Sequence, residues 1–284
     1  MGSSRFLIIG ANGQLGTALK VQYPDAQTVD SAELDITDKS AVDAYDWSKV
    51  DVILNAAAYT NVDGAETPEG KTAARKVNAE AVANLAEVAG KHDLVLVHIS
   101  TAYVFDGTKK SYTETDAMNP LGEYAKSKAA GDEAVLNLKK YYIVRTDSVI
   151  GEGKNFVRTM LSLAAKGIDP TVVADQFIRP TFTTELVRAI AFLLETKPEY
   201  GIYNVTNEGD VVSWADFTRA IFKEAGEERT VTDTTLAQYS SSKPGIAPRP
   251  LYSVLDLAKI KSAGFKPTDW KEDLKAYIDK EKHS

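Results

Sequence analysis

The feature that most constrains the fold is a glycine-rich turn that directly follows the first apolar run of the chain. Residues 6–9 (FLII) have the composition of a buried strand, and the segment GANGQLG at residues 10–16 comes immediately after them. Helical apolar periodicity begins inside this segment and continues to residue 21. A strand, a turn with glycines three residues apart and then a helix are typical of a unit that binds a dinucleotide.

Each glycine of the turn has its own predicted role. Gly10 forms the tight turn, Gly13 lets a pyrophosphate approach backbone N–H groups, and Gly16 lets the helix pack close to the sheet. A tight turn that merely contains three glycines is the alternative interpretation. The position of the turn, after the first strand of a βαβ pattern, favours the dinucleotide.

Further apolar runs at residues 50–54, 94–99 and 141–144 predict more strands, with helical patterns between them. One helical pattern, over residues 77–88, is expected to end at Gly90. Near-continuous apolar runs are typical of parallel strands that are covered on both faces. The first half of the chain therefore predicts repeated βαβ units.

After about residue 150 the pattern changes to short strands and amphipathic helices, for example residues 202–205 and 214–225. We expect an α/β fold with a Rossmann-type doubly wound parallel sheet and a smaller C-terminal α+β region. Residues 1–150 would form the dinucleotide-binding domain. Residues 151–284 would mainly bind substrate, with some segments returning to the sheet.

Composition excludes several classes of protein. The 284 residues include 33 Lys and Arg and 40 Asp and Glu, which give a formal charge of −7 and argue against a nucleic-acid partner. There is no cysteine, which excludes disulfides, a thiolate nucleophile and cysteine-ligated metals. The three histidines are isolated, so no metal site is expected. No apolar run is long enough to span a membrane and no signal peptide is evident, so a cytoplasmic protein is expected.

An acidic residue is expected near the ribose of the cofactor. The second strand should end near Val29 and Asp30, about 20 residues after the glycines, where a carboxylate accepts a hydrogen bond from a ribose 2′-OH. Asp30 favours NADH over NADPH. Asp35 and Ile36 could instead contact the adenine, and the preference between the two cofactors stays open.

Two ionisable side chains share one predicted helix face. Tyr124 and Lys128 are four residues apart, so they are neighbours on a helix. An ammonium next to a phenol favours the phenolate and lowers the tyrosine pKa, which suits acid–base chemistry. An amphipathic surface with a solvated lysine is the alternative. Thr101, at the carboxyl end of the preceding strand, favours the chemical interpretation, because ligands of α/β proteins bind at that edge.

These segments together resemble the extended short-chain dehydrogenase/reductase superfamily and, within it, the dTDP-4-dehydrorhamnose reductase family. The resemblance rests on the glycine turn, on NAAAY at residues 55–59, on Thr101 and on the Tyr124/Lys128 pair. It continues through RPT at residues 179–181 and RPL at residues 249–251, so it covers essentially the whole chain.

The resemblance implies that NADPH or NADH reduces the C4 keto group of dTDP-4-dehydro-L-rhamnose to give dTDP-L-rhamnose. Tyr124 would donate the proton, Lys128 would hold the nicotinamide ribose, and Thr101 would orient the carbonyl. The implied cofactor-binding residues are Gly10, Asn12, Gly13, Gln14, Leu15, Gly16, Asp30, Asp35, Ile36, Ala56, Ala57, Ala58, Tyr59 and Lys128. The implied substrate-binding residues are Ala102, Tyr103, Ser148, Asn155, Arg179 and Arg249. The partner would be a nucleotide sugar, and the protein would be a homodimer or a monomer.

The chain departs from the family pattern at three positions. Ala102 replaces the usual aspartate after the threonine, Ser148 replaces a tryptophan, and Ile150 replaces a second aromatic residue. Either the pocket varies while the reaction is retained, or the substrate is altered or the rate is lower.

Three other functions remain open: reduction of a different nucleotide-linked keto sugar, dehydration or epimerisation, and a non-catalytic role like that of the regulatory subunit of methionine adenosyltransferase. Dehydration is disfavoured because Ala102 and Tyr103 stand where dehydratases carry an Asp-Glu pair.

Overall fold

A parallel sheet of six strands forms the centre of the structure, a computed structural model that describes residues 3–243 and 245–283. Every pairing within this sheet is parallel, which confirms the Rossmann-type α/β expectation. In sheet order, the strands are β10 (Gly201–Asn204), β5 (Tyr141–Thr146), β4 (Val95–Thr101), β3 (Val52–Asn55), β1 (Phe6–Ile9) and β2 (Gln27–Val29).

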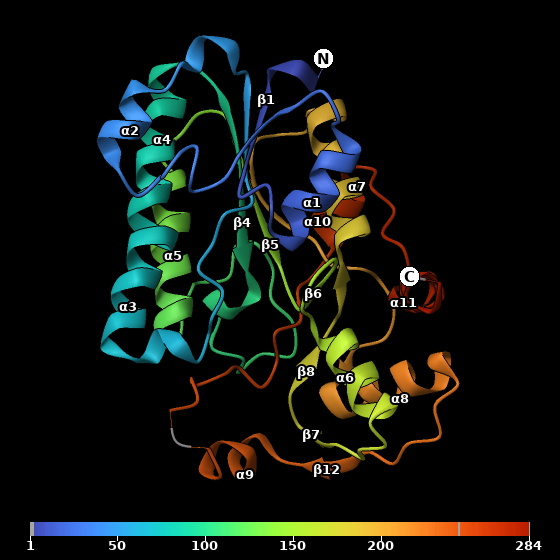
Figure 1. Cartoon of the computed structure of the whole chain (residues 1–284). Helices are drawn as coiled ribbons and strands as arrows, with labels where there is room; N and C mark the ends of the chain where they lie inside the picture. Colours follow the sequence, from blue (N-terminus) through green and yellow to red (C-terminus); the bar gives the residue numbers. More distant parts are fainter. Residues whose placement is uncertain (1–2, 244, 284) are drawn as a thin grey trace.

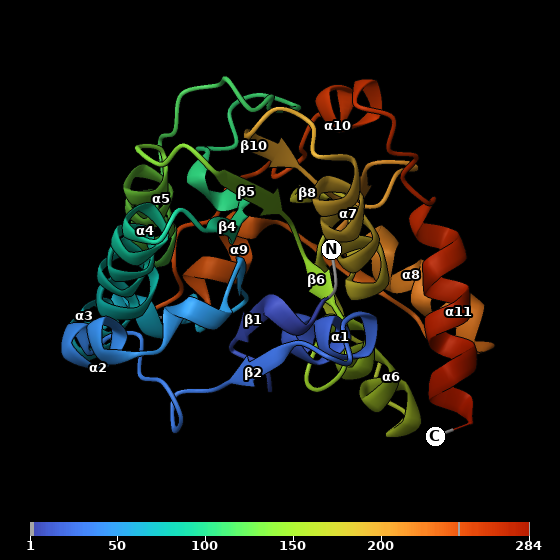
Figure 2. The same cartoon turned by 90° about the horizontal axis from the view of Figure 1, so that it is seen from above.

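Helices cover both faces of the sheet, so the strands are apolar on both sides (Figure 1). Leu7 and Ile9 pack toward one layer of helices, whereas Phe6 and Ile8 pack toward the other. The first layer is α2 (Lys39–Ala44), α3 (Pro68–Arg75), α4 (Ala81–Lys91) and α5 (Glu123–Val135). The second layer is α1 (Gln14–Gln22), α7 (Thr183–Thr196) and α10 (Ala258–Ser262), and Figure 2 shows the two layers from above.

The order of the strands reverses between β1 and β3. The chain passes from β1 outward to β2, then returns to β3 on the other side of β1 and continues through β4 and β5. Ligands of such sheets bind outside the carboxyl ends of the strands at this reversal point. The glycine turn, which follows β1, lies there.

A smaller region packs below the carboxyl edge of the sheet (Figure 1). Its core joins Ile150, Phe182, Phe217 and Trp270 from four separate segments. Its strands are β6 (Val149–Ile150), β7 (Thr171–Val173), β8 (Phe177–Ile178), β9 (Thr181–Phe182), β11 (Val212–Ser213) and β12 (Thr232–Thr234). Its helices are α6 (Phe156–Ala165), α8 (Trp214–Ala225), α9 (Leu236–Ser241) and α11 (Trp270–Lys282).

The structure differs from the sequence expectations in the role of one strand and in the end of one helix. The strand expected at residues 202–205 forms β10, which pairs with β5 and so adds a sixth strand to the main sheet. The expected helix end at Gly90 is wrong, because α4 continues to Lys91 and is capped by His92. The residue that adopts the left-handed backbone conformation after this helix is Asp93, with φ 57°. A glycine is therefore not needed at position 90.

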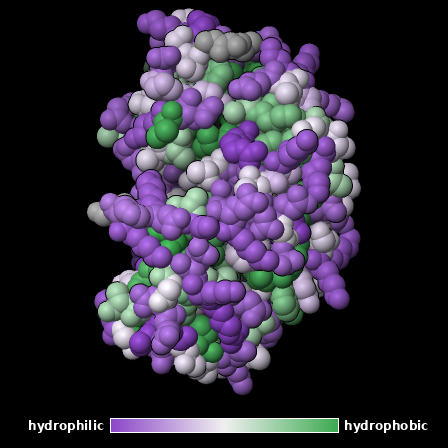
Figure 3. Space-filling model, turned by 90° about the vertical axis from the view of Figure 1, so that its right-hand side faces the viewer, coloured by the Kyte–Doolittle hydropathy of each residue, from purple (hydrophilic) through white to green (hydrophobic). Residues whose placement is uncertain are grey.

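The face in Figure 3 is mostly hydrophilic, and hydrophobic residues appear on it in small separate patches. Among the residues that the structure describes, no helix combines the length and apolar character needed to cross a bilayer.

Backbone segments approach one another very closely at the glycine turn. A Cβ atom on Gly16 would lie 2.2 Å from the carbonyl oxygen of Gly10, and one on Gly10 would lie 2.7 Å from the Cα of Ala57. Gly10 also has φ +76°, a conformation that other residues rarely adopt. The turn therefore joins β1, α1 and the loop after β3 at distances that only glycine permits.

We predict that Gly16→Ala lowers the free energy of unfolding by about 1–3 kcal/mol, because backbone atoms must move to admit the methyl group. Gly13→Ala is the matched control. Its Cβ would lie 3.4 Å from the nearest neighbour and its φ is −74°, so its stability should change by less than about 0.5 kcal/mol. Urea denaturation of both variants measures the difference, and equal losses would contradict this account.

Candidate active site

Loops at the carboxyl ends of four neighbouring strands line one continuous cleft of about 660 Å³. The glycine turn follows β1, and residues 56–58 and Thr60 follow β3. Thr101 ends β4, and residues 146–149 end and follow β5. Residues 152–154 and Trp214 of the smaller region close the other side. The cleft therefore lies between the sheet and the smaller region.

A second pocket, of about 280 Å³, adjoins the glycine turn on the side of β2. Its lining includes Gly10, Asp30, Asp35 and Ile36, and it shares Ala56, Ala57 and Ala58 with the cleft. No lysine or arginine is among its lining residues. Two carboxylates in its lining could accept hydrogen bonds from the hydroxyl groups of a ribose, and the charge of Lys76 acts on one of them, Asp35.

Backbone N–H groups at the start of α1 could hold an anion. Gly13 is the N-cap of α1, and no side chain caps the helix. The first N–H groups of such a helix point outward and carry the positive end of the helix dipole. Gln14 Oε1 is buried without a hydrogen-bond partner. The residues present therefore fit a dinucleotide that passes its pyrophosphate over this turn.

Thr101, Tyr124 and Lys128 converge in the cleft from β4 and α5. Lys128 is 2% exposed and its Nζ donates a hydrogen bond of 2.6 Å to the carbonyl oxygen of Ile99. Thr101 and Tyr124 interact through their hydroxyl groups. The structure thus brings a hydroxyl, a phenol and an ammonium to one wall of the cleft.

Burial sets the protonation states of this group. The expectation that Lys128 lowers the tyrosine pKa is wrong, because desolvation raises the pKa of Tyr124 to about 12, although the hydrogen bond with Thr101 opposes the shift. Desolvation lowers the pKa of Lys128 to about 8, opposed by the charge of Asp132. At neutral pH, Tyr124 therefore holds its proton and can act as an acid, and Lys128 is a cation.

An irregular helical turn fixes the helix that carries these residues. Residues 76–80 form a π-helical turn between α3 and α4, and the buried side chain of Asn78 bonds both backbone groups of Tyr59. Asn78 Nδ2 also donates to Ser127 Oγ, which in turn donates to the carbonyl oxygen of Tyr124. A single amide thus ties the loop after β3 to α5.

Behind Lys128, a buried ion pair joins α5 to β5. Asp132, one turn further along α5, accepts a 3.1 Å hydrogen bond from Arg145 Nε, and both side chains are almost fully buried. His98 lies 3.8 Å from the same carboxylate, and desolvation lowers its pKa well below the usual value, so it is neutral. This network anchors the base of α5 against the sheet.

Another part of the cleft wall comes from the segment after β5. Asp147 lines the cleft and is buried, and Ser148 adopts a left-handed conformation with φ 47°. Ser253 Oγ donates a 2.8 Å hydrogen bond to Asp147 Oδ2. Trp214 adds an aromatic surface, with its ring 4.4 Å from that of Phe156.

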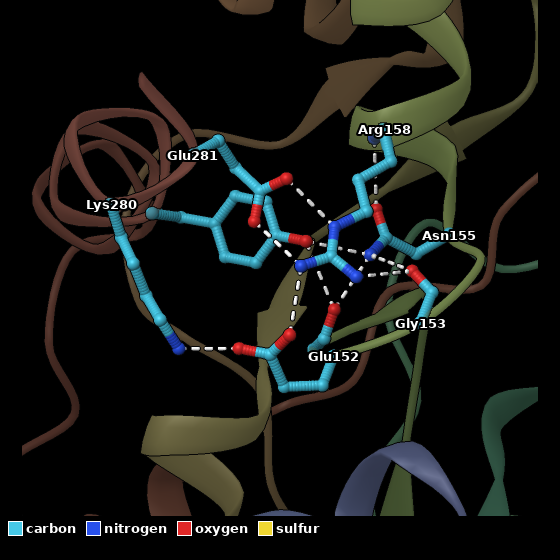
Figure 4. Close-up of polar contacts among 8 residues, drawn as sticks. Glu152, Gly153, Asn155, Arg158, Lys280 and Glu281 are labelled. Atoms are coloured by element: carbon cyan, nitrogen blue, oxygen red, sulfur yellow. Dashed lines mark hydrogen bonds and ion pairs between the residues drawn. The ribbon is translucent and has the colours of Figure 1, made fainter. Parts of the chain in front are cut away.

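An ion-pair network holds the rim of the cleft to the last helix of the chain (Figure 4). Arg158 of α6 contacts Glu152 at 2.8 Å and Glu281 of α11 at 2.7 Å, and Lys280 also pairs with Glu152. Asn155 Nδ2 donates to the carbonyl oxygens of residues 151 and 153. We call this the rim network, and it fixes the loop that carries residues 152–154.

Some residues implied by the resemblance do not line the cleft or the pocket beside it. Asn155 is the N-cap of α6, and its amide is used within the rim network. Arg179 donates to the carbonyl oxygen of Leu255, and Arg249 is paired with Asp63 at 2.8 Å. Their polar groups therefore serve contacts between segments. Gly16, Tyr59 and Ala102 are likewise outside both linings.

The remaining implied residues lie where a ligand could touch them. The cleft is lined by Asn12, Gly13, Gln14, Leu15, Ala56, Ala57, Ala58, Thr101, Tyr103, Tyr124, Lys128 and Ser148, and the adjoining pocket by Gly10, Asp30, Asp35 and Ile36. Sequence reasoning missed Asp147, Glu152 and Trp214. For Asp147 a signal existed, because it directly follows a strand on the binding edge of the sheet.

Comparison with known proteins places this geometry in a family. The family model described as "RmlD substrate binding domain" matches residues 4–283. The dTDP-4-dehydrorhamnose reductase of Aggregatibacter actinomycetemcomitans is 43% identical over 289 residues, covering 96% of this chain and 97% of that protein. The dTDP-4-keto-6-deoxy-D-glucose reductase of Streptomyces niveus is 34% identical and covers 93% of each chain.

A solved structure shows the same fold. The crystal structure of dTDP-4-dehydrorhamnose reductase from Bacillus anthracis str. Ames in complex with NADP has a TM-score of 0.89 to this chain. The two chains are 34% identical, and the match covers 97% of this chain and 99% of the other.

We predict that removing the buried ammonium of Lys128 stabilises the protein. The pKa of Lys128 falls from 10.5 to about 8 on folding, and each pKa unit is worth about 1.4 kcal/mol. Lost hydrogen bonding to Ile99 offsets part of this, so Lys128→Met should raise the free energy of unfolding at pH 7 by about 1–2 kcal/mol.

The extra stability of Lys128→Met should decrease as the pH rises. Between about pH 8 and pH 10.5 the unfolded wild type binds more protons than the folded one, so its stability rises with pH in this window. The advantage of Lys128→Met should therefore shrink from pH 8 to pH 10. Urea denaturation at several pH values tests this, and a constant difference would show that desolvation of the ammonium is not the cause.

Proposed function

Since the chain belongs to the RmlD substrate-binding-domain family and is a reductase of the dTDP-4-dehydrorhamnose reductase type, we propose that it reduces the C4 keto group of dTDP-4-dehydro-L-rhamnose to give dTDP-L-rhamnose. The observation that carries this proposal is the convergence of Thr101, Tyr124 and Lys128 in one cleft beside the glycine turn. The bound nicotinamide supplies the hydride that reduces the carbonyl carbon.

Residues of the protein orient the carbonyl oxygen of the substrate and protonate it. Thr101 donates a hydrogen bond that orients the carbonyl oxygen, and Tyr124 Oη transfers its proton to that oxygen as negative charge develops there. A phenol with a pKa raised to about 12 is protonated before the reaction, as a proton donor must be. The ammonium of Lys128 then stabilises the phenolate that remains.

A second substrate has some support. The relative from Streptomyces niveus is a reductase of dTDP-4-keto-6-deoxy-D-glucose, a sugar with the same reacting carbonyl. Ser148, which lines the cleft, stands where the family pattern has a large tryptophan side chain, whereas Ala102 is buried outside the cleft lining. A pocket with this serine fits a 4-keto sugar of different ring stereochemistry, and turnover of both substrates decides between them.

Tyr124→Phe tests the chemical role. We expect kcat to fall at least about 100-fold, because the variant keeps the ring and loses the proton. The dissociation constant of the cofactor should change less than about twofold. The assay follows substrate-dependent oxidation of NADH or NADPH with dTDP-4-dehydro-L-rhamnose.

Tyr103→Phe is the matched control for this variant. Tyr103 also lines the cleft, but its hydroxyl interacts with Gln176 and its ring packs edge-on against Tyr124. Its loss of kcat should be much smaller. Equal effects of the two substitutions, or no turnover by the wild type with either cofactor, would contradict the proposal.

We further propose that NADH is used in preference to NADPH, because the pocket beside β2 contains Asp30 and Asp35 and no basic residue. A 2′-phosphate would be repelled by the two carboxylates, and the described residues that line the pocket include no guanidinium to bind it. The ratio of kcat/KM for NADH to that for NADPH should exceed one. Asp30→Ala should lower this ratio roughly tenfold, and a ratio unaffected by the substitution would remove Asp30 from cofactor selection.

A further inference from the structure

Asp147 is a deeply buried carboxylate that faces the cleft and has no charged partner. It is 4% exposed, and its side chain lies in the wall that also includes Ser148. Among the described residues, no lysine, arginine or histidine forms an ion pair with it. The other carboxylate of the cleft, Glu152, is neutralised within the rim network. Asp147 is thus unlike the other acids in this region.

The contacts within the protein satisfy the carboxylate only in part. Ser253 Oγ donates at 2.8 Å, and interactions with Ser148 and with the backbone N–H of Arg179 add to this. Desolvation nevertheless outweighs these contacts and raises the pKa of Asp147 to about 7. Among the described residues, Ser253 is the one donor that reaches the carboxylate with full hydrogen-bond geometry, and it binds Oδ2, so Oδ1 remains as an acceptor for a ligand. A buried carboxylate without a cation is costly for stability, which favours a function at this position.

The position of Asp147 relative to the reacting group is set by strand register. Thr146 of β5 pairs directly with Thr101 of β4, and Asp147 is the next residue along β5. Its charge also acts on Tyr103 and Tyr124, which line the same cleft. Thr101, Tyr124 and Asp147 all line the same cleft, so a ligand whose carbonyl oxygen meets Thr101 and Tyr124 can present a neighbouring ring substituent to Asp147.

We propose that Asp147 is a specificity-determining residue that accepts a hydrogen bond from the hydroxyl group on the ring carbon next to the keto carbon. This inference rests on the proposed function, because it takes the ligand to be a nucleotide-linked 4-keto sugar. On such a ring, C5 carries the 6-deoxy carbon, so the neighbouring hydroxyl is the one on C3. Asp147 makes the cleft select sugars that retain this hydroxyl.

The selection has a physical cause. Binding a sugar expels water from the cleft, so the free acceptor sites of Asp147 lose their solvent partners. A C3 hydroxyl replaces those partners, whereas a 3-deoxy sugar leaves a buried polar group unsatisfied. Sites built to bind a hydroxyl reject analogues that lack it far more strongly than apolar pockets reject an extra methylene group.

The test compares ligands that differ only at C3. Isothermal titration of the protein with NAD⁺ bound would measure the dissociation constants of dTDP-L-rhamnose and of its 3-deoxy analogue. For the wild type we expect the 3-deoxy sugar to bind roughly 100-fold more weakly. For Asp147→Ala the two ligands should differ less than about fivefold, and dTDP alone should bind both proteins equally.

Two further variants separate specificity from structure. Asp147→Asn keeps the shape and one acceptor, so it should fold and show intermediate discrimination. Ser253→Ala removes the same internal hydrogen bond from its other end and leaves the carboxylate in place, so discrimination should persist. If Ser253→Ala loses discrimination as fully as Asp147→Ala, the aspartate acts only by holding its loop and the inference is overturned.

The binding and turnover measurements distinguish two kinds of failure. If the wild type reduces dTDP-4-dehydro-L-rhamnose but binds both C3 ligands equally, the role of Asp147 is overturned and the proposed function stands. If the wild type discriminates at C3 through Asp147 but reduces no keto sugar, the proposed reaction is overturned while the role of Asp147 in binding stands.

Discussion

The architecture depends on the close approach of three backbone segments where the order of the strands reverses. At Gly10 and Gly16, the turn after β1 touches both the first helix and the loop after β3 at distances that exclude a Cβ atom. This contact places the outward-pointing N–H groups of α1 beside residues 56–58, which the cleft and its neighbouring pocket share. The cleft and its neighbouring pocket therefore meet at one junction of three backbone segments.

Around this junction, burial rather than ion pairing sets the chemistry. Tyr124, Lys128 and Asp147 all have pKa values shifted mainly by desolvation, and each shift favours the neutral form. The phenol therefore keeps its proton at neutral pH. Charged partners lie one layer outside, as in the Asp132–Arg145 pair and the rim network, where they hold segments in place.

The parts of the site that could be predicted from sequence are those with local signals. The glycine turn, the spacing of Tyr124 and Lys128, and the position of Thr101 at a strand end each follow from a few adjacent residues, and the structure brings them together. The alternation of strands and helices likewise predicted the Rossmann-type sheet, which the structure confirms.

The parts that could not be predicted depend on distant segments. Arg179 and Arg249 carry the charge expected of phosphate ligands, but their partners, Leu255 and Asp63, lie far away in the sequence. Trp214 has the periodicity of a packing residue, and only the fold brings it to the cleft. The departures at Ala102 and Ser148 suggested a loss of an acid and of an aromatic wall. Asp147 and Trp214 supply both kinds of group from other positions.

The pairing of β10 with β5 has a consequence for the order in which the chain can fold during synthesis. The edge of β5 is apolar, and its partner is not made until residues 201–204 emerge, after about a fifth of the chain has intervened. Until then the nascent sheet exposes a strand edge that can pair with other chains. The sixth strand of the sheet can therefore be added only after most of the chain has been made.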